Sequence, residues 1–233
     1  MILAGFERFT LIDYPKKMAC IIFLHGCNFR CSFCHNPELV IEKSEEKIDE
    51  EKIFDFLKKR SKKIEGVVIS GGEPLITLKE SFLRKIKELG YLIKLDTNGS
   101  FPEKLQDFIE KGLIDFVSMD IKSSPEKYEE VTQTKVNLKD IEKSIKIISK
   151  LKNYEFRTTI VKKYHNLEEI KKMVKWLNKI TEKKPRTLVL QGFKNSGKLI
   201  NPELKKEQNV QDEYLEELKK EIKHDFEEVV IRN

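Results

Sequence analysis

The sequence contains few cysteines and no long apolar run. Its 233 residues include four cysteines, all near the amino terminus, and disulfides placed there could not staple the rest of the chain. No apolar stretch approaches the roughly 18 to 20 residues that span a bilayer, and residues 1–8 lack the apolar core of a signal peptide. These absences argue against a membrane-spanning protein and against a disulfide-framed secreted one, so we expect a cytoplasmic protein.

Charge is abundant, and the basic residues outnumber the acidic ones. Charged residues make up 36% of the chain, and the formal net charge is +6. A basic surplus can indicate a nucleic-acid-binding surface. The two signs alternate along helical segments, however, as in Glu45–Lys47, which is typical of solvated helix surface. We therefore expect no nucleic-acid partner.

Short apolar runs alternate along the chain with helical patterns, in which apolar residues recur three and four positions apart. Residues 82–89 form one such helical stripe, and Gly90 is placed to end it. Asn137 and Asn166 are placed as the N-caps of two further helices. The apolar runs predict six short buried strands: Ala19–Leu24, Gly66–Ser70, Leu92–Thr97, Phe116–Ile121, Glu155–Val161 and Thr187–Gly192.

This alternation predicts an α/β fold in which crossover helices pack outside a parallel sheet. A complete eight-unit barrel takes about 250 residues. Six units therefore predict a partial (β/α)₆ open barrel, in a single domain over residues 1–233. Asn195–Gln208 is polar and is predicted as a loop, and Glu227–Ile231 could add a short strand. Ligands of such folds sit at the carboxyl ends of the strands, where the chemically suggestive residues of this chain fall.

The central motif is a cysteine loop directly after the first predicted strand. Cys27, Cys31 and Cys34 form a C-x3-C-x2-C pattern. Thiolates are the ligands that hold iron–sulfur clusters. Three thiolates on one short loop can bind three irons of a [4Fe–4S] cluster and leave the fourth iron open to a small molecule.

Other uses of these cysteines remain open. A zinc site would need a fourth ligand, which Cys20, His25 or His35 could supply. The cysteines could also be metal-free, or could hold a purely electron-carrying cluster, although such a cluster normally has four cysteine ligands. Cys20 lies inside an apolar strand, where a buried thiol that acts as a small hydrophobe is ordinary. The spacing favours the cluster with an open iron.

Polar residues and glycines stand at the ends of the later strands. Gly71–Pro74 could let a ligand approach the backbone closely, or could be an ordinary turn. Asp96–Gly99 and Asp120–Lys122 end the next two strands, where their charges could form a salt bridge or a turn. Arg157 lies in an otherwise apolar strand and needs an anionic partner, either a cofactor carboxylate or an internal Asp or Glu.

Taken together, these motifs resemble the radical S-adenosylmethionine (SAM) superfamily. In that family the cysteines bind three irons, and the amino and carboxylate groups of SAM chelate the fourth. The D-T-N-G and D-x-K patterns at Asp96–Gly99 and Asp120–Lys122 are similar to the glycyl-radical-enzyme activating subgroup. Residues 6–40, with Leu11–Pro15 and His35–Glu38, resemble the activating protein of anaerobic ribonucleoside-triphosphate reductase. Pyruvate formate-lyase activating enzyme shares the H-N-P-E run.

The resemblance implies an activity. The reduced cluster would cleave SAM to methionine and a 5′-deoxyadenosyl radical, which would remove the Cα hydrogen of a glycine on anaerobic ribonucleotide reductase. A flavodoxin or ferredoxin would supply the electron. The alternatives are an activase of another glycyl radical enzyme, a compact radical enzyme with a small-molecule substrate, and a non-catalytic zinc or iron–sulfur interaction module. Four cysteines cannot hold both the loop cluster and an auxiliary four-cysteine cluster.

The resemblance also implies a set of site residues. The Gly71–Pro74 segment would contact the methionyl amino group of SAM, and a monovalent cation could bind near Asp96 and Asp120. The implied iron ligands are Cys27, Cys31 and Cys34. The implied SAM contacts lie beside the cysteines and at the strand ends: Phe33, His35, Asn36, Gly71, Gly72, Glu73, Asp96, Thr97, Asn98, Asp120, Lys122, Arg157 and Gln191.

Overall fold

The structure is a computed structural model that describes residues 1–40, 48–195 and 198–232. The chain groups into two compact units. The first comprises Met1–Asn28, Glu38–Thr97 and Glu103–Val117, and the second comprises Phe29–Pro37, Asn98–Pro102 and Ser118–Asn233. The single domain predicted over residues 1–233 stays a prediction.

Two predictions reach beyond the described residues. The alternating charges of Glu45–Lys47 lie outside them, as do residues 196 and 197 of the predicted loop Asn195–Gln208. The described part of that loop includes a short 3-10 helix, Pro202–Lys206. Among the helices that the structure describes, none has the length and apolar content to cross a membrane.

The first unit contains four neighbouring strands in chain order. β2 pairs in parallel with β3, and β3 with β4, whereas β1 pairs antiparallel with β2. The predicted strands are confirmed here, but β1 was not predicted because its sequence, with Gly5 in it, lacks a regular alternation of apolar and polar side chains. The bounds are β1 Leu3–Thr10, β2 Ala19–Leu24, β3 Gly66–Gly71 and β4 Leu92–Thr97.

Helices of the first unit bury one apolar face each. α2 buries Ile53 and Leu57, and α3 buries Phe82, Leu83 and Ile86 from the predicted stripe. Helix α3 ends just before Gly90, as predicted. The helices are α1 Pro37–Val40, which begins in the second unit, α2 Glu50–Arg60, the 3-10 helix Pro74–Ile76, α3 Glu80–Glu88 and α4 Pro102–Glu110.

The second unit continues the parallel pattern. β6 pairs in parallel with β7, and β7 with β8, so the possible last strand is confirmed one residue later than predicted. β5 begins at the end of the first unit and enters the second, where the backbone N–H of Ile121 bonds to the carbonyl of Arg157. The bounds are β5 Phe116–Asp120, β6 Tyr154–Ile160, β7 Thr187–Gly192 and β8 Glu228–Arg232.

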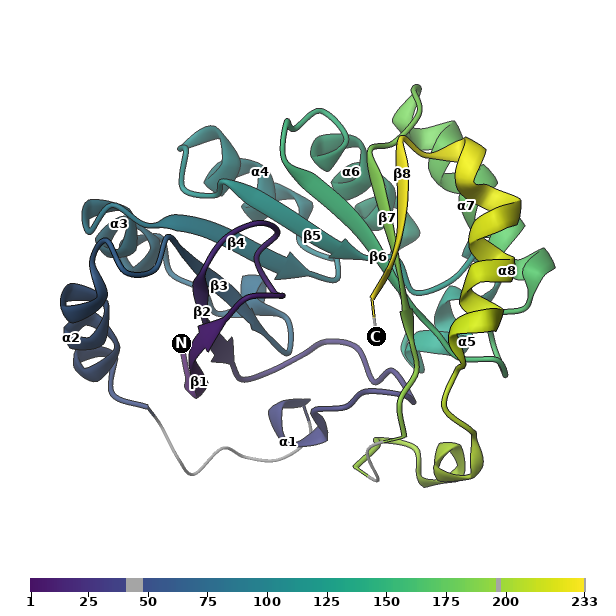
Figure 1. Cartoon of the computed structure of the whole chain (residues 1–233), viewed down its shortest axis with the longest axis horizontal. Coiled ribbons are helices and arrows are strands. Elements are labelled where there is room, and N and C mark those ends of the chain that lie inside the picture. Colours follow the sequence, from purple (N-terminus) through teal and green to yellow (C-terminus); the bar gives the residue numbers. More distant parts are fainter. Residues whose placement is uncertain (41–47, 196–197, 233) are drawn as a thin grey trace. The chain divides into compact units, whose positions relative to one another are not determined.

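Helices α7 and α8 pack beside one another in the second unit, and α8 covers β7 and β8 (Figure 1). Both predicted N-caps are confirmed: the side chain of Asn137 accepts the N–H of Lys139, and that of Asn166 accepts the N–H of Glu169. The helices are the 3-10 helix Pro125–Lys127, α5 Tyr128–Thr132, α6 Leu138–Ile148, α7 Leu167–Thr181, α8 Asp212–Ile222 and the 3-10 helix Lys223–Asp225.

The cap of α6 gives a test of this local structure. Asn137→Ala removes the acceptor for a backbone N–H at the helix start, so the free energy of unfolding should fall by about 1 kcal/mol. Asn137→Ser keeps an acceptor oxygen at the cap and should retain most of the stability. Like alanine, serine lacks the amide that donates to Asp140 at 2.9 Å, so the two variants differ in the cap. Urea unfolding of the metal-free protein measures both variants. Equal losses in the two variants would contradict a capping role.

Candidate functional site

In the first unit, the end of β3 packs closely against the segment that leads to Cys27. Gly71 has a φ of +121°, and a Cβ on it would lie 2.2 Å from the carbonyl oxygen of Leu24. A Cβ on Gly72 would lie 2.1 Å from the carbonyl oxygen of Gly26. The N–H of Gly72 donates to Leu24 at 3.0 Å. No side chain could be accommodated at either position without moving backbone, so the two glycines are required by this close approach.

Glu73 is a fully buried carboxylate at the same strand end. Its backbone N–H donates to the carbonyl of Gly26 at 2.7 Å. Its Oε1 accepts from the N–H of Leu75 at 3.1 Å and from the Thr97 hydroxyl at 2.9 Å. Glu73 therefore links the end of β3 to the end of β4 and fixes the backbone just before Cys27.

Asp96, at the end of β4, is held by two neighbours in the first unit. Its Oδ2 accepts from the Ser70 hydroxyl at 3.1 Å. The side chain of Lys94 is fully buried, and its ammonium lies 2.7 Å from Oδ1 of Asp96. The two groups form an ion pair without the geometry of a hydrogen bond. A fixed positive charge thus already lies beside this carboxylate. The monovalent cation proposed near Asp96 and Asp120 stays a prediction.

The second half of the cysteine loop belongs to the second unit and has no helix or strand of its own. The N–H of Cys34 donates to the carbonyl of Cys31 at 3.0 Å, which makes a tight turn between the two thiols. Burial, only partly offset by the positive charge of Lys122, raises the pKa of the Cys31 thiol to about 11. Without a metal, Cys31 is therefore protonated at neutral pH, and a bound iron must displace that proton.

Asp120, Lys122 and Arg157 form one charged cluster in the second unit. Asp120 accepts from Arg157 Nε at 2.7 Å through Oδ1 and from Lys122 Nζ at 2.9 Å through Oδ2. Burial disfavours the Asp120 charge, but the two cations outweigh it and hold the pKa of that carboxyl well below its usual range. Burial likewise opposes the charge of Lys122, and Asp120 restores it, which raises its pKa. The sequence left two possible partners for Arg157, a cofactor carboxylate or an internal Asp or Glu. The structure pairs it with the internal acid Asp120.

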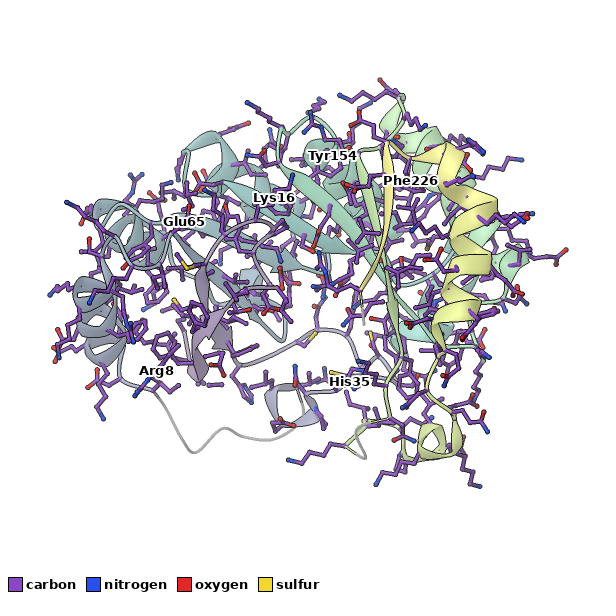
Figure 2. All side chains as sticks on the ribbon, in the orientation of Figure 1. Arg8, Lys16, His35, Glu65, Tyr154 and Phe226 are labelled. Atoms are coloured by element: carbon purple, nitrogen blue, oxygen red, sulfur yellow. The ribbon has the colours of Figure 1, made fainter. Side chains whose placement is uncertain are left out.

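The remaining predicted contacts are dispersed over loops and strand ends. His35, which Figure 2 labels, lies in the loop that follows Cys34. Its ring stacks on Phe193, with ring centroids 5.7 Å apart, and burial lowers its pKa. Asn36 is exposed, whereas Asn98 is buried and its Oδ1 accepts from the N–H of Ser100. Gln191 is half-buried near the end of β7.

Four residues of these surroundings were not predicted. Lys94 could have been recognised, because a lone lysine inside an apolar strand shares a face with the acid two residues later. Phe193 follows the end of β7 and carries no other signal. Tyr164 and His165 lie between β6 and α7 and contact the cysteine loop, as detailed below. No motif in the sequence marks those two.

The predicted iron ligands divide between the two units. Cys27 lies in the first, and Cys31 and Cys34 lie in the second. Within the described residues, no three His, Cys, Asp or Glu side chains are gathered as a ready metal site. No disulfide joins any of the four cysteines, which all lie within the described residues. Cys20 is fully buried in β2, where desolvation raises its pKa to about 12. The donor set, three thiols on one loop that no disulfide engages, fits an iron–sulfur cluster chemically.

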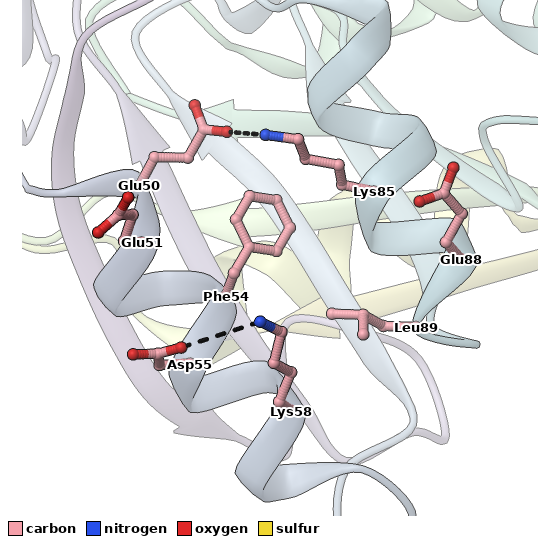
Figure 3. Close-up of a pocket in the computed structure, with 8 residues that line it drawn as sticks. All are labelled: Glu50, Glu51, Phe54, Asp55, Lys58, Lys85, Glu88 and Leu89. Atoms are coloured by element: carbon pink, nitrogen blue, oxygen red, sulfur yellow. Dashed lines mark hydrogen bonds and ion pairs between the residues drawn. The ribbon is translucent and has the colours of Figure 1, made fainter.

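A further pocket lies between α2 and α3 (Figure 3). Phe54 stands at its centre, and Lys85 pairs with Glu50 at 3.0 Å. Its remaining lining residues are Glu51, Asp55, Lys58, Glu88 and Leu89. The pocket contains none of the predicted site residues and is open to solvent, so we assign it to the surface between two helices.

His165 gives a pH-dependent test of the site. Its ring is fully buried, and desolvation lowers its pKa to about 4, although Glu169 opposes that shift. Because the unfolded chain then binds more protons between pH 6.5 and 4, stability should fall as the pH drops through that window. The loss should be about 2–3 kcal/mol by pH 4.5.

Urea unfolding of the metal-free protein at pH 7 and pH 4.5 measures this loss. The His165→Gln variant removes the titrating group and should show a drop smaller by that amount. Asp120 contributes little to this drop. Its pKa is depressed in the folded protein, so the stability that it provides is lost mainly below the pKa of an unfolded aspartate, which is about 3.9. An equal drop in the two proteins would contradict the assignment of a buried neutral imidazole.

Comparison with known proteins places this geometry in a family. The model of the radical SAM superfamily matches residues 21–177. A protein of Methanocaldococcus jannaschii, provisionally named a glycyl-radical enzyme activating enzyme, is 38% identical over 173 residues, which cover 70% of this chain and 69% of that protein. The pyruvate formate-lyase-activating enzyme of Listeria monocytogenes is 32% identical over 143 residues, 56% of this chain and 57% of that protein.

The fold agrees with these relatives. The crystal structure of QueE from Escherichia coli superposes with a TM-score of 0.59 at 13% identity, and the match covers 100% of this chain and 93% of that one. This likeness confirms the predicted α/β partial barrel. The chain therefore belongs to the radical SAM superfamily, whose members use a [4Fe–4S] cluster and S-adenosylmethionine, and it is homologous to the glycyl-radical enzyme activating enzymes of that superfamily.

Proposed function

We propose that this protein activates anaerobic ribonucleotide reductase by generating a glycyl radical on it. The observation that carries the proposal is the C-x3-C-x2-C loop placed directly after β2 in a chain homologous to activating enzymes. The target is the finer part of the proposal. It is supported by the likeness of residues 6–40 to the activating protein of that reductase.

Cys27, Cys31 and Cys34 would hold three irons of the [4Fe–4S] cluster. None of these three thiols is in a disulfide, and Cys20 is left out because it is a fully buried residue of β2. When bound, the cluster supplies the electron that reductively cleaves SAM, which begins the removal of hydrogen from a glycine Cα. Every other task belongs to side chains and backbone of the chain itself.

The strand ends would bind and orient SAM. In the first unit, Glu73 and Thr97 bind one another, and Asp96 is held by Ser70 and Lys94, so these groups are fixed before a ligand arrives. In the second unit, the Asp120 cluster keeps two cations and one carboxylate charged. Such preorganised charges avoid reorganisation when a polar ligand binds. Phe33, His35, Asn36, Gly71, Gly72, Asn98, Lys122, Arg157 and Gln191 complete the proposed contacts.

A second candidate target is pyruvate formate-lyase, because the Listeria relative is named as the activating enzyme of that lyase. A flavodoxin or ferredoxin would donate the electron to either activase, in the cytoplasm. A small-molecule substrate and a non-catalytic metal-binding module are the alternatives that the experiments below would reveal.

The iron ligands are tested by a matched pair of cysteine variants. Anaerobically reconstituted protein should bind about four irons per chain. Cys31→Ala should lose the intact cluster and all cleavage of SAM under reduction. Cys20→Ala should keep its iron, because that thiol is a core residue. Retained cleavage in Cys31→Ala, or a large iron loss in Cys20→Ala, would show that the ligand assignment is wrong.

The target is tested by mixing the reduced, SAM-bound protein with candidate partners. Electron paramagnetic resonance should detect a glycyl radical on anaerobic ribonucleotide reductase and none on a reductase whose radical glycine is replaced by alanine. A signal on pyruvate formate-lyase alone would favour the second target. Cleavage of SAM without a radical on either partner would favour a small-molecule substrate.

A further inference from the structure

His165 is bonded through both ring nitrogens in the second unit. Nδ1 accepts the backbone N–H of Val161 at 3.0 Å, so the ring proton must lie on Nε2. Nε2 then donates to the carbonyl oxygen of Lys122 at 2.8 Å. The edge of the ring also meets Phe33 of the cysteine loop, with centroids 6.4 Å apart and the planes at 72°. His165 therefore joins the cysteine loop to the strand end that carries Lys122.

Tyr164 holds the adjacent residue of the same loop. The hydroxyl of Ser32, which is fully buried, donates to Tyr164 Oη at 3.0 Å. The carbonyl of Ser32 accepts the N–H of Asn201 at 3.1 Å. The side-chain hydroxyl and the backbone carbonyl of Ser32 are thereby bonded, and a buried hydroxyl that lost its partner would lower the stability.

The dipeptide Tyr164–His165 is itself rigidly supported. The N–H groups of both residues donate to the carbonyl of Val161, at 2.9 and 2.8 Å, which makes a tight turn after β6. The Tyr214 hydroxyl of α8 donates to the carbonyl of His165 at 2.8 Å. The rings of Tyr164 and His165 meet edge to face, with centroids 6.3 Å apart. The turn therefore connects the cysteine loop to the end of β6 and to α8.

We propose that Tyr164 and His165 are positioning residues that preorganise the Cys31–Cys34 turn before the cluster binds. This rests on the proposed function, since it takes Cys31 and Cys34 as iron ligands. This part of the loop has no helix or strand of its own, so contacts such as these contribute directly to its order. A loop ordered in advance loses less entropy when the metal binds.

The test compares two chemically identical changes. Tyr164→Phe removes only the hydroxyl that holds Ser32. Tyr91→Phe is the control: Tyr91 is also buried, and its hydroxyl donates to the carbonyl of Leu57 in the first unit, away from the cysteine loop in the chain. Both variants should lower the melting temperature of the metal-free protein by a similar amount.

Only Tyr164→Phe should affect the loop. Hydrogen exchange of the peptide that covers residues 29–36, in metal-free protein, should accelerate about tenfold, and iron loss from the reconstituted protein to a chelator should accelerate similarly. Ser32→Ala should have the same effect, and the double variant should be no worse than either single one, because both remove the same bond. For His165, Gln should preserve more of the iron retention than Leu, because its amide can still donate to the carbonyl of Lys122.

The outcomes separate this inference from the proposed function. If the unaltered protein holds iron and cleaves SAM, but Tyr164→Phe exchanges and loses iron no faster than Tyr91→Phe, the positioning role is wrong and the activase stands. Equal acceleration in the two variants would likewise reduce Tyr164 to a structural residue. If the unaltered protein neither holds a cluster nor cleaves SAM, both the proposed function and this inference are overturned.

Discussion

The central constraint on this protein is that the proposed iron ligands lie on a loop without helix or strand, so that neighbouring segments must give it its shape. In the first unit, the approach to Cys27 is bonded to Gly72 and Glu73 at the end of β3. In the second unit, Ser32 and Phe33 are held by the turn after β6. The glycines at 71 and 72 are required for a related reason, because a Cβ at either position would displace the backbone at Leu24 or Gly26, on the approach to Cys27.

Charge compensation is the second feature that unites the site. Each carboxylate at a strand end is held by hydrogen-bond donors or a cation of its own unit: Lys94 and Ser70 for Asp96, Thr97 for Glu73, and Lys122 with Arg157 for Asp120. Buried charges persist only when they are paired and bonded in this way. These three carboxylates, which are proposed to meet SAM, are therefore fixed within their own units by their neighbours.

The sequence predicts much of this arrangement, because parallel strands and their carboxyl ends follow from apolar runs. Arg157 was assigned a necessary anionic partner, but the choice of Asp120 required the register of β5 against β6. Lys94 was overlooked, although its spacing from Asp96 places both on one strand face. Tyr164 and His165 could not be predicted from the sequence. The contact of Tyr164 with Ser32 joins residues 132 positions apart, and that of His165 with Lys122 joins residues 43 positions apart. β1 was missed because its residues do not alternate.

The open iron is the claim on which the account depends most directly, and Mössbauer spectroscopy of protein reconstituted with ⁵⁷Fe tests it. With three thiolate ligands, one iron of the [4Fe–4S] cluster must take its remaining ligand from SAM. Addition of SAM should therefore change the spectrum of about one quarter of the cluster iron and leave the rest unaltered. A spectrum that does not respond to SAM, or that fits a cluster with four equivalent protein ligands, would contradict the account.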